Sequence, residues 1–434
     1  MFSKPRVNFL RKYLTIVLLS ASGSTLSIAS PNTESLHVSE TKNISVEDMI
    51  AIAFQYNPNV TSSQFNVDAA QSEVSAARNQ FLPTPSISYG NANKGRDNFS
   101  ASLTQPLWTG GKLTSGLEYA QARVRSAEDG VYEVKYKLAL SIIDLWRTYQ
   151  SKVAEEKVTL QTLTRYQRYQ NIIENRIAGG RSSEADLTFI RSRVMQAESD
   201  LATINADKIT ALNNLSRVVG IGLDSKYLAF SFPLNDKSYP LEKYLERSVE
   251  HSPTLKRLHS DILVASRQAD VKRANLFPNI NLVASREQYK NNNSGTLTDN
   301  KIMVNIQYTP GAGFTSYYDY SNSTQRVDAL KYNLESEKIY LQNDIYSTVV
   351  SLNSALSRIN LIKNQTTENN KVLESYTRQF EFGQKTWIDL LNAARELSAS
   401  EISYAQLQSS IAAYEWKLKI YTGEYKKEGF STHE

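Results

Sequence analysis

Apolar residues follow two different periods along this chain, and each period occurs twice. From Leu187 to Val218 they recur at steps of three and four residues, in a seam that only Lys208 interrupts. The same steps return from Leu390 to Tyr421, so the two seams are 203 positions apart (390 − 187 = 203). A seam of this kind predicts a helix in a coiled coil, and we expect nearly all of its members to be packing residues.

A long helical pattern precedes each seam. Residues 113–177 and 314–382 contain no helix-breaking segment, and the apolar Leu138 and Ile142 of the first run match Leu341 and Ile345 of the second at the same separation. At 1.5 Å per residue, each helix would be about 100 Å long. Each run and its seam therefore predict one antiparallel coiled-coil hairpin.

The corners that join the runs to the seams also share one spacing. Gly180 precedes Asp186 by six residues, and Gly383 precedes Asp389 by six residues. A Gly can adopt the left-handed conformation that ends a helix, and a Ser or Thr after it can cap the next helix. One such corner is an ordinary helical turn, and its recurrence makes it a candidate functional element.

The second period is an alternation of apolar and polar residues. It runs from Phe99 to Leu107 and from Ile302 to Tyr308, and shorter runs around Ile87 and Ile280 precede these segments across Asn-rich loops. The alternation predicts two strand hairpins, at 84–109 and 279–309.

Each predicted strand has about ten residues, which is the length that a tilted strand needs to cross a bilayer. Aromatic residues near the strand ends favour membrane interfaces: Tyr89, Trp108, Tyr289 and Tyr308. The polar positions would face a water-filled lumen: Ser100, Ser102, Thr104, Asn305 and Gln307. A soluble hairpin resting on a helical body remains the alternative. In lipid, four strands would leave unsatisfied edges, so the chain would have to pool its strands with other copies.

The first thirty residues have the pattern of a signal peptide. Four basic residues up to Lys12 precede an apolar core at 14–19, and small residues then continue to Ala29. We therefore expect export. The chain has no Cys, which excludes disulfides and an acylated N-terminal Cys.

Prolines recur at one offset in the two halves, because Pro58 and Pro83 match Pro253 and Pro278 at 195 positions (253 − 58 = 278 − 83 = 195). The second half therefore repeats the first. We predict a signal peptide at 1–30, a first repeat at 31–222 with a coiled-coil hairpin at 112–220, an inter-repeat linker or equatorial segment at 223–240, a second repeat at 241–423 with a coiled-coil hairpin at 314–423, and a C-terminal tail at 424–434.

Composition excludes several functions for these 434 residues. The net charge is only +5 and its Lys and Arg are spread evenly, so nucleic acid is not an expected partner. After the first thirty residues no run of eighteen apolar residues occurs, so strands would have to make any membrane crossing. The four His have no metal-site spacing and no nucleophile motif is present, so we expect no enzyme activity, metal or cofactor.

In its overall organisation, this chain resembles the TolC family of outer-membrane efflux and secretion proteins. The resemblance rests on the signal sequence, on the lack of Cys, and on an order of elements that occurs twice: helix, strand hairpin, very long helix, Gly-x5-Asp corner and return helix. The resemblance covers about 46–423. It implies a mainly helical fold with a small β part, in which long antiparallel coiled-coil helices form a trimeric α-barrel. Four strands per protomer would build a 12-stranded transmembrane β-barrel (4 × 3 = 12). It also implies the outer membrane of a Gram-negative bacterium, with contact to outer-membrane lipid and extension into the periplasm.

On this resemblance, the two corners form the periplasmic tip. The family pattern Arg-x-x-x-Gly-x5-Asp is met by Arg176, Gly180 and Asp186, and its second copy retains Gly383 and Asp389. The residues implied in docking a periplasmic adaptor are Arg176, Gly180, Asp186, Gly383, Lys385 and Asp389. The residues implied in the pore constriction are Phe380, Asp389 and Asn392.

Three tip residues depart from the family. Asn392 stands where some members place a second Asp, Phe380 where a Tyr can bond a neighbouring coil, and Lys385 where an Arg can. Asp389 is then the remaining candidate for an acidic ring at the pore. A carboxylate that simply stabilises the N-terminus of its helix is an equal alternative.

The resemblance implies a passive exit duct of a tripartite efflux or type I secretion system. The homotrimer would receive substrate from an inner-membrane transporter of the ABC or RND type, through the adaptor. The alternative is a soluble periplasmic coiled-coil scaffold or chaperone without channel activity. A general diffusion porin fits less well, because porins are built from strands throughout.

Overall fold

The computed structural model describes residues 44–92, 96–225, 228, 239–291 and 295–425. The predicted signal peptide, most of the predicted linker and the end of the tail lie outside the described residues. The boundaries proposed for the repeats stay predictions, whereas the helices and strands within them can be compared directly with the sequence patterns.

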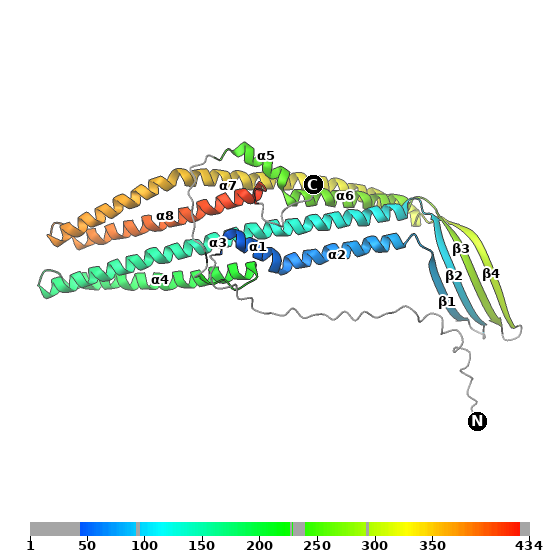
Figure 1. Ribbon diagram of the computed structural model, residues 1–434, viewed down its shortest axis with the longest axis horizontal. Coiled ribbons are helices and arrows are strands. Elements are labelled where there is room, and N and C mark those ends of the chain that lie inside the picture. The colour runs from blue at the N-terminus through cyan, green and yellow to red at the C-terminus, as the bar shows by residue number, and fades with distance from the viewer. Residues whose placement is uncertain (1–43, 93–95, 226–227, 229–238, 292–294, 426–434) are drawn as a thin grey trace, which may run out of the picture. The chain divides into compact units, whose positions relative to one another are not determined.

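The element order of the first half recurs in the second (Figure 1). The first half contains α1 (Val46–Tyr56), α2 (Pro58–Asn79), β1 (Thr84–Ala92), β2 (Arg96–Trp108), α3 (Lys112–Ala178) and α4 (Glu184–Val219). The second contains α5 (Leu241–His251), α6 (Pro253–Ala274), β3 (Asn279–Asn291), β4 (Gly295–Gln307), the 3-10 turn η2 (Ala312–Phe314), α7 (Thr315–Glu381) and α8 (Trp387–Tyr421). The predicted mainly helical fold with two strand hairpins is confirmed.

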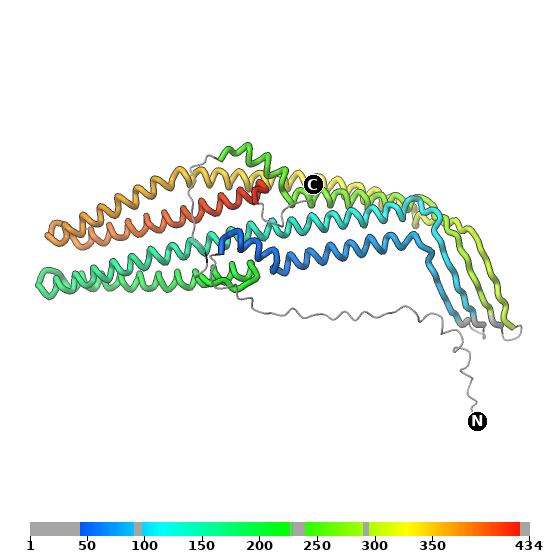
Figure 2. Tube along the Cα trace, in the orientation of Figure 1, coloured from blue at the N-terminus to red at the C-terminus, as the bar shows by residue number. Residues whose placement is uncertain are grey.

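Two long helices organise the arrangement of the described elements. Helices α3 and α7 have 67 residues each, which corresponds to about 100 Å. Toward the strands, the helices lie side by side in the order α2, α3, α6 and α7, and toward the other end in the order α4, α3, α8 and α7 (Figure 2). Helices α2 and α4 therefore occupy one edge of the layer and α7 the other, which leaves both edges open to neighbouring copies.

The paired prolines explain the short helices of both halves. Pro58 and Pro253 each occupy the first turn of a helix, where a missing N–H costs nothing. Their predecessors Asn57 and Ser252 cap these helices through side-chain oxygens that accept bonds from the backbone amides of Asn59 and Leu255. The break between α1 and α2, and the one between α5 and α6, are thus encoded locally.

The seams predicted from the three–four spacing form the packed faces of α4 and α8. Leu187, Ile190 and Leu215 are almost fully buried in the first seam, as are Leu390 and Leu397 in the second. The interruption at Lys208 is accommodated by an ion pair in which its Nζ lies 2.5 Å from Oε1 of Glu156 on α3. The partly buried Lys208 and Glu156 thus form an ion pair across the coiled coil, at a seam position that an apolar residue would otherwise occupy.

The four strands form one antiparallel sheet in the order β1-β2-β3-β4. Strands β2 and β3 join the two halves, with a bulge between Pro106 and Trp108. Within the described part of the chain, β1 and β4 each pair with one strand only, so the sheet has two open edges. Among the described helices, none is long and apolar enough to cross a membrane.

Candidate functional site at the helical tip

The corner between α3 and α4 is closed by backbone hydrogen bonds around Gly180. Its φ of 66° is left-handed, and the amide of Arg181 then donates to the carbonyl of Arg176 at 2.7 Å. Helix α4 begins with a capping box, in which the amide of Ser183 donates to Oδ2 of Asp186 at 3.1 Å and the Ser183 hydroxyl accepts from the amide of Asp186. The corner is therefore specified by a few local residues.

The corner between α7 and α8 repeats these bonds 203 positions later. Gly383 has a φ of 75°, and the amide of Gln384 donates to the carbonyl of Gln379 at 2.9 Å. Oδ2 of Asp389 accepts from the Thr386 amide at 3.1 Å and from the Thr386 hydroxyl at 2.8 Å. The shared spacing of Gly and Asp is thus the signature of one turn geometry used twice.

Hydrogen bonds from Thr386 stabilise the charged form of Asp389. The Thr386 hydroxyl contributes most, followed by its backbone amide, and Lys385 adds a smaller attraction; together they lower the pKa of Asp389. The carboxylate is exposed to solvent and ionised at neutral pH. Within the protomer, Asp389 caps the N-terminus of its helix, as one of the two predictions for this residue stated. Its carboxylate is also accessible to a ligand outside the protomer.

One contact joins the two corners, and the sequence did not reveal it. The Arg176 Nη1 donates to the carbonyl of Phe380 at 2.9 Å, and its guanidinium lies 4.4 Å from the centre of the Phe380 ring. Phe380 is buried, and it packs against Trp387 with ring centres 5.6 Å apart. Trp387 in turn meets Tyr169 of α3 edge to face. The sequence assigned Arg176 to docking and Phe380 to the constriction, whereas the structure brings them together; we call this contact the Arg176–Phe380 clamp.

A polar contact joins the same two hairpins farther from the corners. The hydroxyls of Thr162 on α3 and Ser398 on α8 are 2.6 Å apart, and Arg165 donates to the Ser398 hydroxyl at 3.2 Å. Glu401 lies 3.8 Å from Arg165, and its pKa is raised because partial burial outweighs the attraction of Arg165. These polar groups interrupt an interface that is otherwise apolar, because Tyr169 of α3 packs there against Trp387 of α8.

The remaining predicted residues occupy the end of the hairpins. Lys385 lies with its Nζ 4.4 Å from the centre of the Tyr376 ring, and Asn392 is exposed on α8. Gly180 and Gly383 are exposed at the two corners. Phe380 alone among the constriction residues is buried within the protomer. Among the described residues, no group of His, Asp and Glu is arranged to hold a metal ion.

The chain matches the model of a protein family described as outer membrane efflux protein, over residues 49–221 and 244–424. It is 20% identical to the outer membrane efflux protein BepC of Brucella suis biovar 1 (strain 1330), over 86% of this chain and 83% of that protein. It is also 20% identical to protein CyaE of Bordetella pertussis (strain Tohama I / ATCC BAA-589 / NCTC 13251), over about half of each (56% and 54%).

Solved structures show the same fold. A structure of CusC, a protein described as forming a transmembrane channel, superposes with a TM-score of 0.74 at 17% identity, covering 88% of this chain and 92% of CusC. Because the family model spans both halves and the structural match includes both helices and strands, this chain belongs to the outer membrane efflux protein family, the TolC family of channels that span the outer membrane and the periplasm.

Proposed function

We propose that this protein is the exit duct of a tripartite efflux or type I secretion system. Substrate passes through it from an inner-membrane transporter of the ABC or RND type and a periplasmic adaptor. Channels of this family are trimeric and lie in the outer membrane, and they are not enzymes. Family membership therefore favours a channel over the soluble scaffold considered above.

The repeated corner is the observation that carries this proposal. Both hairpins end in one turn geometry, at the end of α3 and α7 that lies about 100 Å from the strands. Three protomers would present six such corners around one axis. A partner with repeated binding sites could engage all six with equivalent contacts, which favours an adaptor that itself assembles as a ring.

We assign docking to the exposed ends of the corners. Gly180 and Gly383 keep the backbone accessible there, while Asp186 and Asp389 keep the turn in shape through their capping boxes. Lys385 adds positive charge beside Asp389, and Arg176 adds a second cation at the same end of the hairpins. An adaptor surface with hydrogen-bond acceptors and small side chains would complement this end of the molecule.

We assign gating to the contacts between the two hairpins. Widening the tip requires α7 and α8 to move relative to α3 and α4, and the Arg176–Phe380 clamp joins α3 directly to α7. Phe380 then acts by holding the hairpins together from within the protomer. Asp389 and Asn392, which are accessible at the start of α8, remain the residues proposed for the lining of the constriction.

The docking proposal can be tested by crosslinking, because the chain contains no Cys of its own. Gln384→Cys places one thiol on the exposed second corner, and Ser72→Cys places a matched thiol on the exposed face of α2. A thiol-to-amine crosslinker is applied to intact cells, and the captured proteins are identified by mass spectrometry. We expect a periplasmic adaptor from the Gln384 variant alone. Capture from Ser72 alone, with folded trimers in both variants, would exclude docking at the tip.

A further inference from the structure

The register of the sheet separates its side chains into two faces. Residues directly opposite each other on neighbouring strands point to the same face, and alternate residues point to the other. One face carries mainly polar side chains, and we call it the hydroxyl face after its row of Ser86, Ser102 and Ser285. The other face carries most of the large apolar side chains: Ile87, Tyr89, Phe99, Leu103, Leu282, Ile302, Val304 and Ile306. In a membrane channel the second face is the lipid-facing one.

The apolar band on the lipid-facing side is stepped across the sheet. On β2 it extends as far as Phe99, which is opposite Gln288 of β3. On β3 the last apolar residue is Ala284, four positions earlier (288 − 284 = 4). A membrane boundary crosses strands at different residues when the strands are inclined, as they are in transmembrane barrels. The boundary on β3 therefore lies just beyond Ala284, on the side of the hairpin loops.

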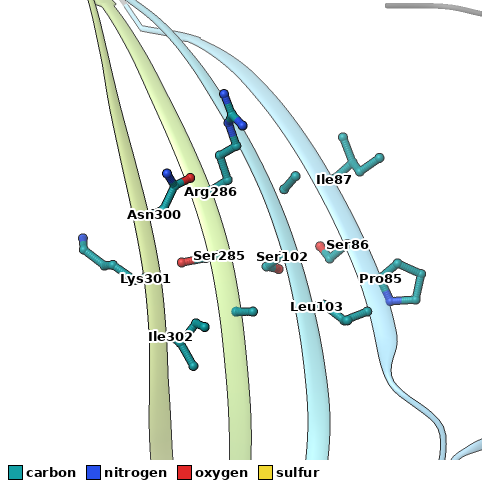
Figure 3. A pocket seen from close by; sticks show the side chains of 12 residues that line it. Pro85, Ser86, Ile87, Ser102, Leu103, Ser285, Arg286, Asn300, Lys301 and Ile302 are labelled. Atoms are coloured by element: carbon teal, nitrogen blue, oxygen red, sulfur yellow. The ribbon is translucent and has the colours of Figure 1, made fainter. Parts of the chain in front are cut away.

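A shallow hollow of about 580 Å³ lies at this boundary (Figure 3). Two rows of residues line it on the lipid-facing side. The row nearer the helices contains Pro85, Leu103, Ala284 and Ile302, and the row nearer the loops contains Ile87, Ala101, Arg286 and Asn300. Residues of the row between them point to the hydroxyl face and contribute backbone to the floor. The small Ala101 and Ala284 lie between larger apolar neighbours, so the hollow has apolar walls.

Arg286 stands at the loop end of this hollow. Its guanidinium extends toward the hairpin loops, and the side chain of Asn300 lies beside it (Figure 3). Arg286 is exposed, and it makes no ion pair with any residue that the structure describes. Lys301, one position along from Asn300, instead points to the hydroxyl face, where its Nζ is 2.7 Å from Asp299. The lipid-facing side thus presents a cation without a partner at the membrane boundary.

We propose that this hollow is a binding site for lipopolysaccharide of the outer leaflet. One acyl chain lies against Ala101 and Ala284, and a phosphate of the lipid headgroup accepts hydrogen bonds from the Arg286 guanidinium. An Arg presents a planar fork that matches a phosphate, and a long side chain at the edge of the apolar band reaches the headgroup level. The inference depends on the outer-membrane location and the register of the sheet, and not on the adaptor or transporter proposed above.

The experiment counts bound lipid on the whole trimer. Trimers purified in detergent are titrated with a short-chain lipopolysaccharide, and the bound molecules are counted by native mass spectrometry. We expect Arg286→Gln to weaken binding about tenfold, because it removes the charged partner of the phosphate. Ala101→Leu, which fills the hollow without changing charge, should also weaken binding. Lys301→Gln is the matched control, since it removes a cation of the opposite face at nearly the same depth, and it should leave binding unchanged.

Three results would overturn the proposal. One is equal binding by wild type and Arg286→Gln trimers. Another is a loss of lipopolysaccharide binding in Lys301→Gln as large as the loss in Arg286→Gln, which would indicate a general effect of charge. The third uses the wild-type trimer alone: a lipopolysaccharide from which the phosphates have been removed should bind about tenfold more weakly, so undiminished binding excludes phosphate recognition even if a variant fails to fold. Preference for phosphatidylglycerol over lipopolysaccharide at this site would exclude the assigned lipid.

Discussion

Removing the Arg176–Phe380 clamp should open the channel. In Arg176→Ala, the carbonyl of Phe380 loses a charged donor and its ring loses a cation. A hydrogen bond to a charged group contributes about 1.5–3 kcal/mol, and a partly exposed cation–π contact about 0.5–1 kcal/mol. Since Arg176 is only partly buried, we take the lower end of each range, and the two contributions add to about 2 kcal/mol per protomer. If the clamp breaks on opening, this corresponds to about a thirtyfold shift toward the open arrangement for each protomer, and to a larger shift if the three protomers open together.

Single-channel recording in planar lipid bilayers measures this shift as the open fraction of the trimer. Phe380→Leu keeps the backbone carbonyl and removes only the ring, so its open fraction should rise less, by about threefold. Arg181→Ala, at the exposed end of the same corner, is the matched control and should behave like wild type. An open fraction for Arg176→Ala that stays within threefold of wild type, with the trimer intact, would refute the reasoning.

Three further results are expected at the tip. Gly180→Val forces a β-branched residue into a left-handed conformation with a φ of 66°, so adaptor crosslinking should fall while the trimer persists on a native gel; dissociation of the trimer would contradict this. Because hydrogen bonds from Thr386 lower the pKa of Asp389, this carboxylate stabilises its corner above the ordinary pKa of about 3.9 and loses that contribution as pH falls through its lower folded value. The protection factors of amide hydrogen exchange at the corner, which are corrected for the slower intrinsic exchange at low pH, should therefore fall below about pH 4, and Thr386→Ala should flatten this pH dependence. Trp387 buries its Nε1 without a hydrogen-bond partner among the described residues, so Trp387→Phe should change the unfolding free energy by no more than about 1 kcal/mol, and Trp387→Ala should cost about 3–5 kcal/mol in thermal unfolding.

The repeat shows how much of the fold could be predicted from local patterns. The spacing from Leu187 to Val218 predicted a packed helix because a seam at steps of three and four can only be buried along one face. The corners were recognised because Gly180 and Gly383 precede Asp186 and Asp389 at one distance. Each of these features depends on spacings of a few residues, and the return of the same spacings 203 positions later made them recognisable.

The candidate site was predicted only in part, because its central contact is not local. Arg176 and Phe380 are 204 positions apart, and no spacing rule relates a side chain of one hairpin to a carbonyl of the other. The repeat offered one clue, since the residue that corresponds to Arg176 is Gln379, beside Phe380. The sequence placed both residues at the tip and could not show that one holds the other.

The lipid-facing hollow of the sheet could likewise be predicted only in part from the sequence. Alternation along each strand predicted which residues share a face of that strand. Whether Ala101 stands beside Arg286 depends on the register between β2 and β3, which belong to different halves of the chain. A shift of that register by one residue would move Arg286 to the opposite face.

By itself, the sequence determined the repeat, the kinds of element and their order, and the end of the molecule that carries the corners. Helical seams, strand alternation and capping boxes are properties of short segments, and their physical causes act over a few residues. The tertiary structure decided which helices are neighbours, how Arg176 joins the two hairpins and where Arg286 lies relative to the apolar band. These features depend on packing and register between segments that are far apart in the chain, and such contacts form only when the whole layer is assembled.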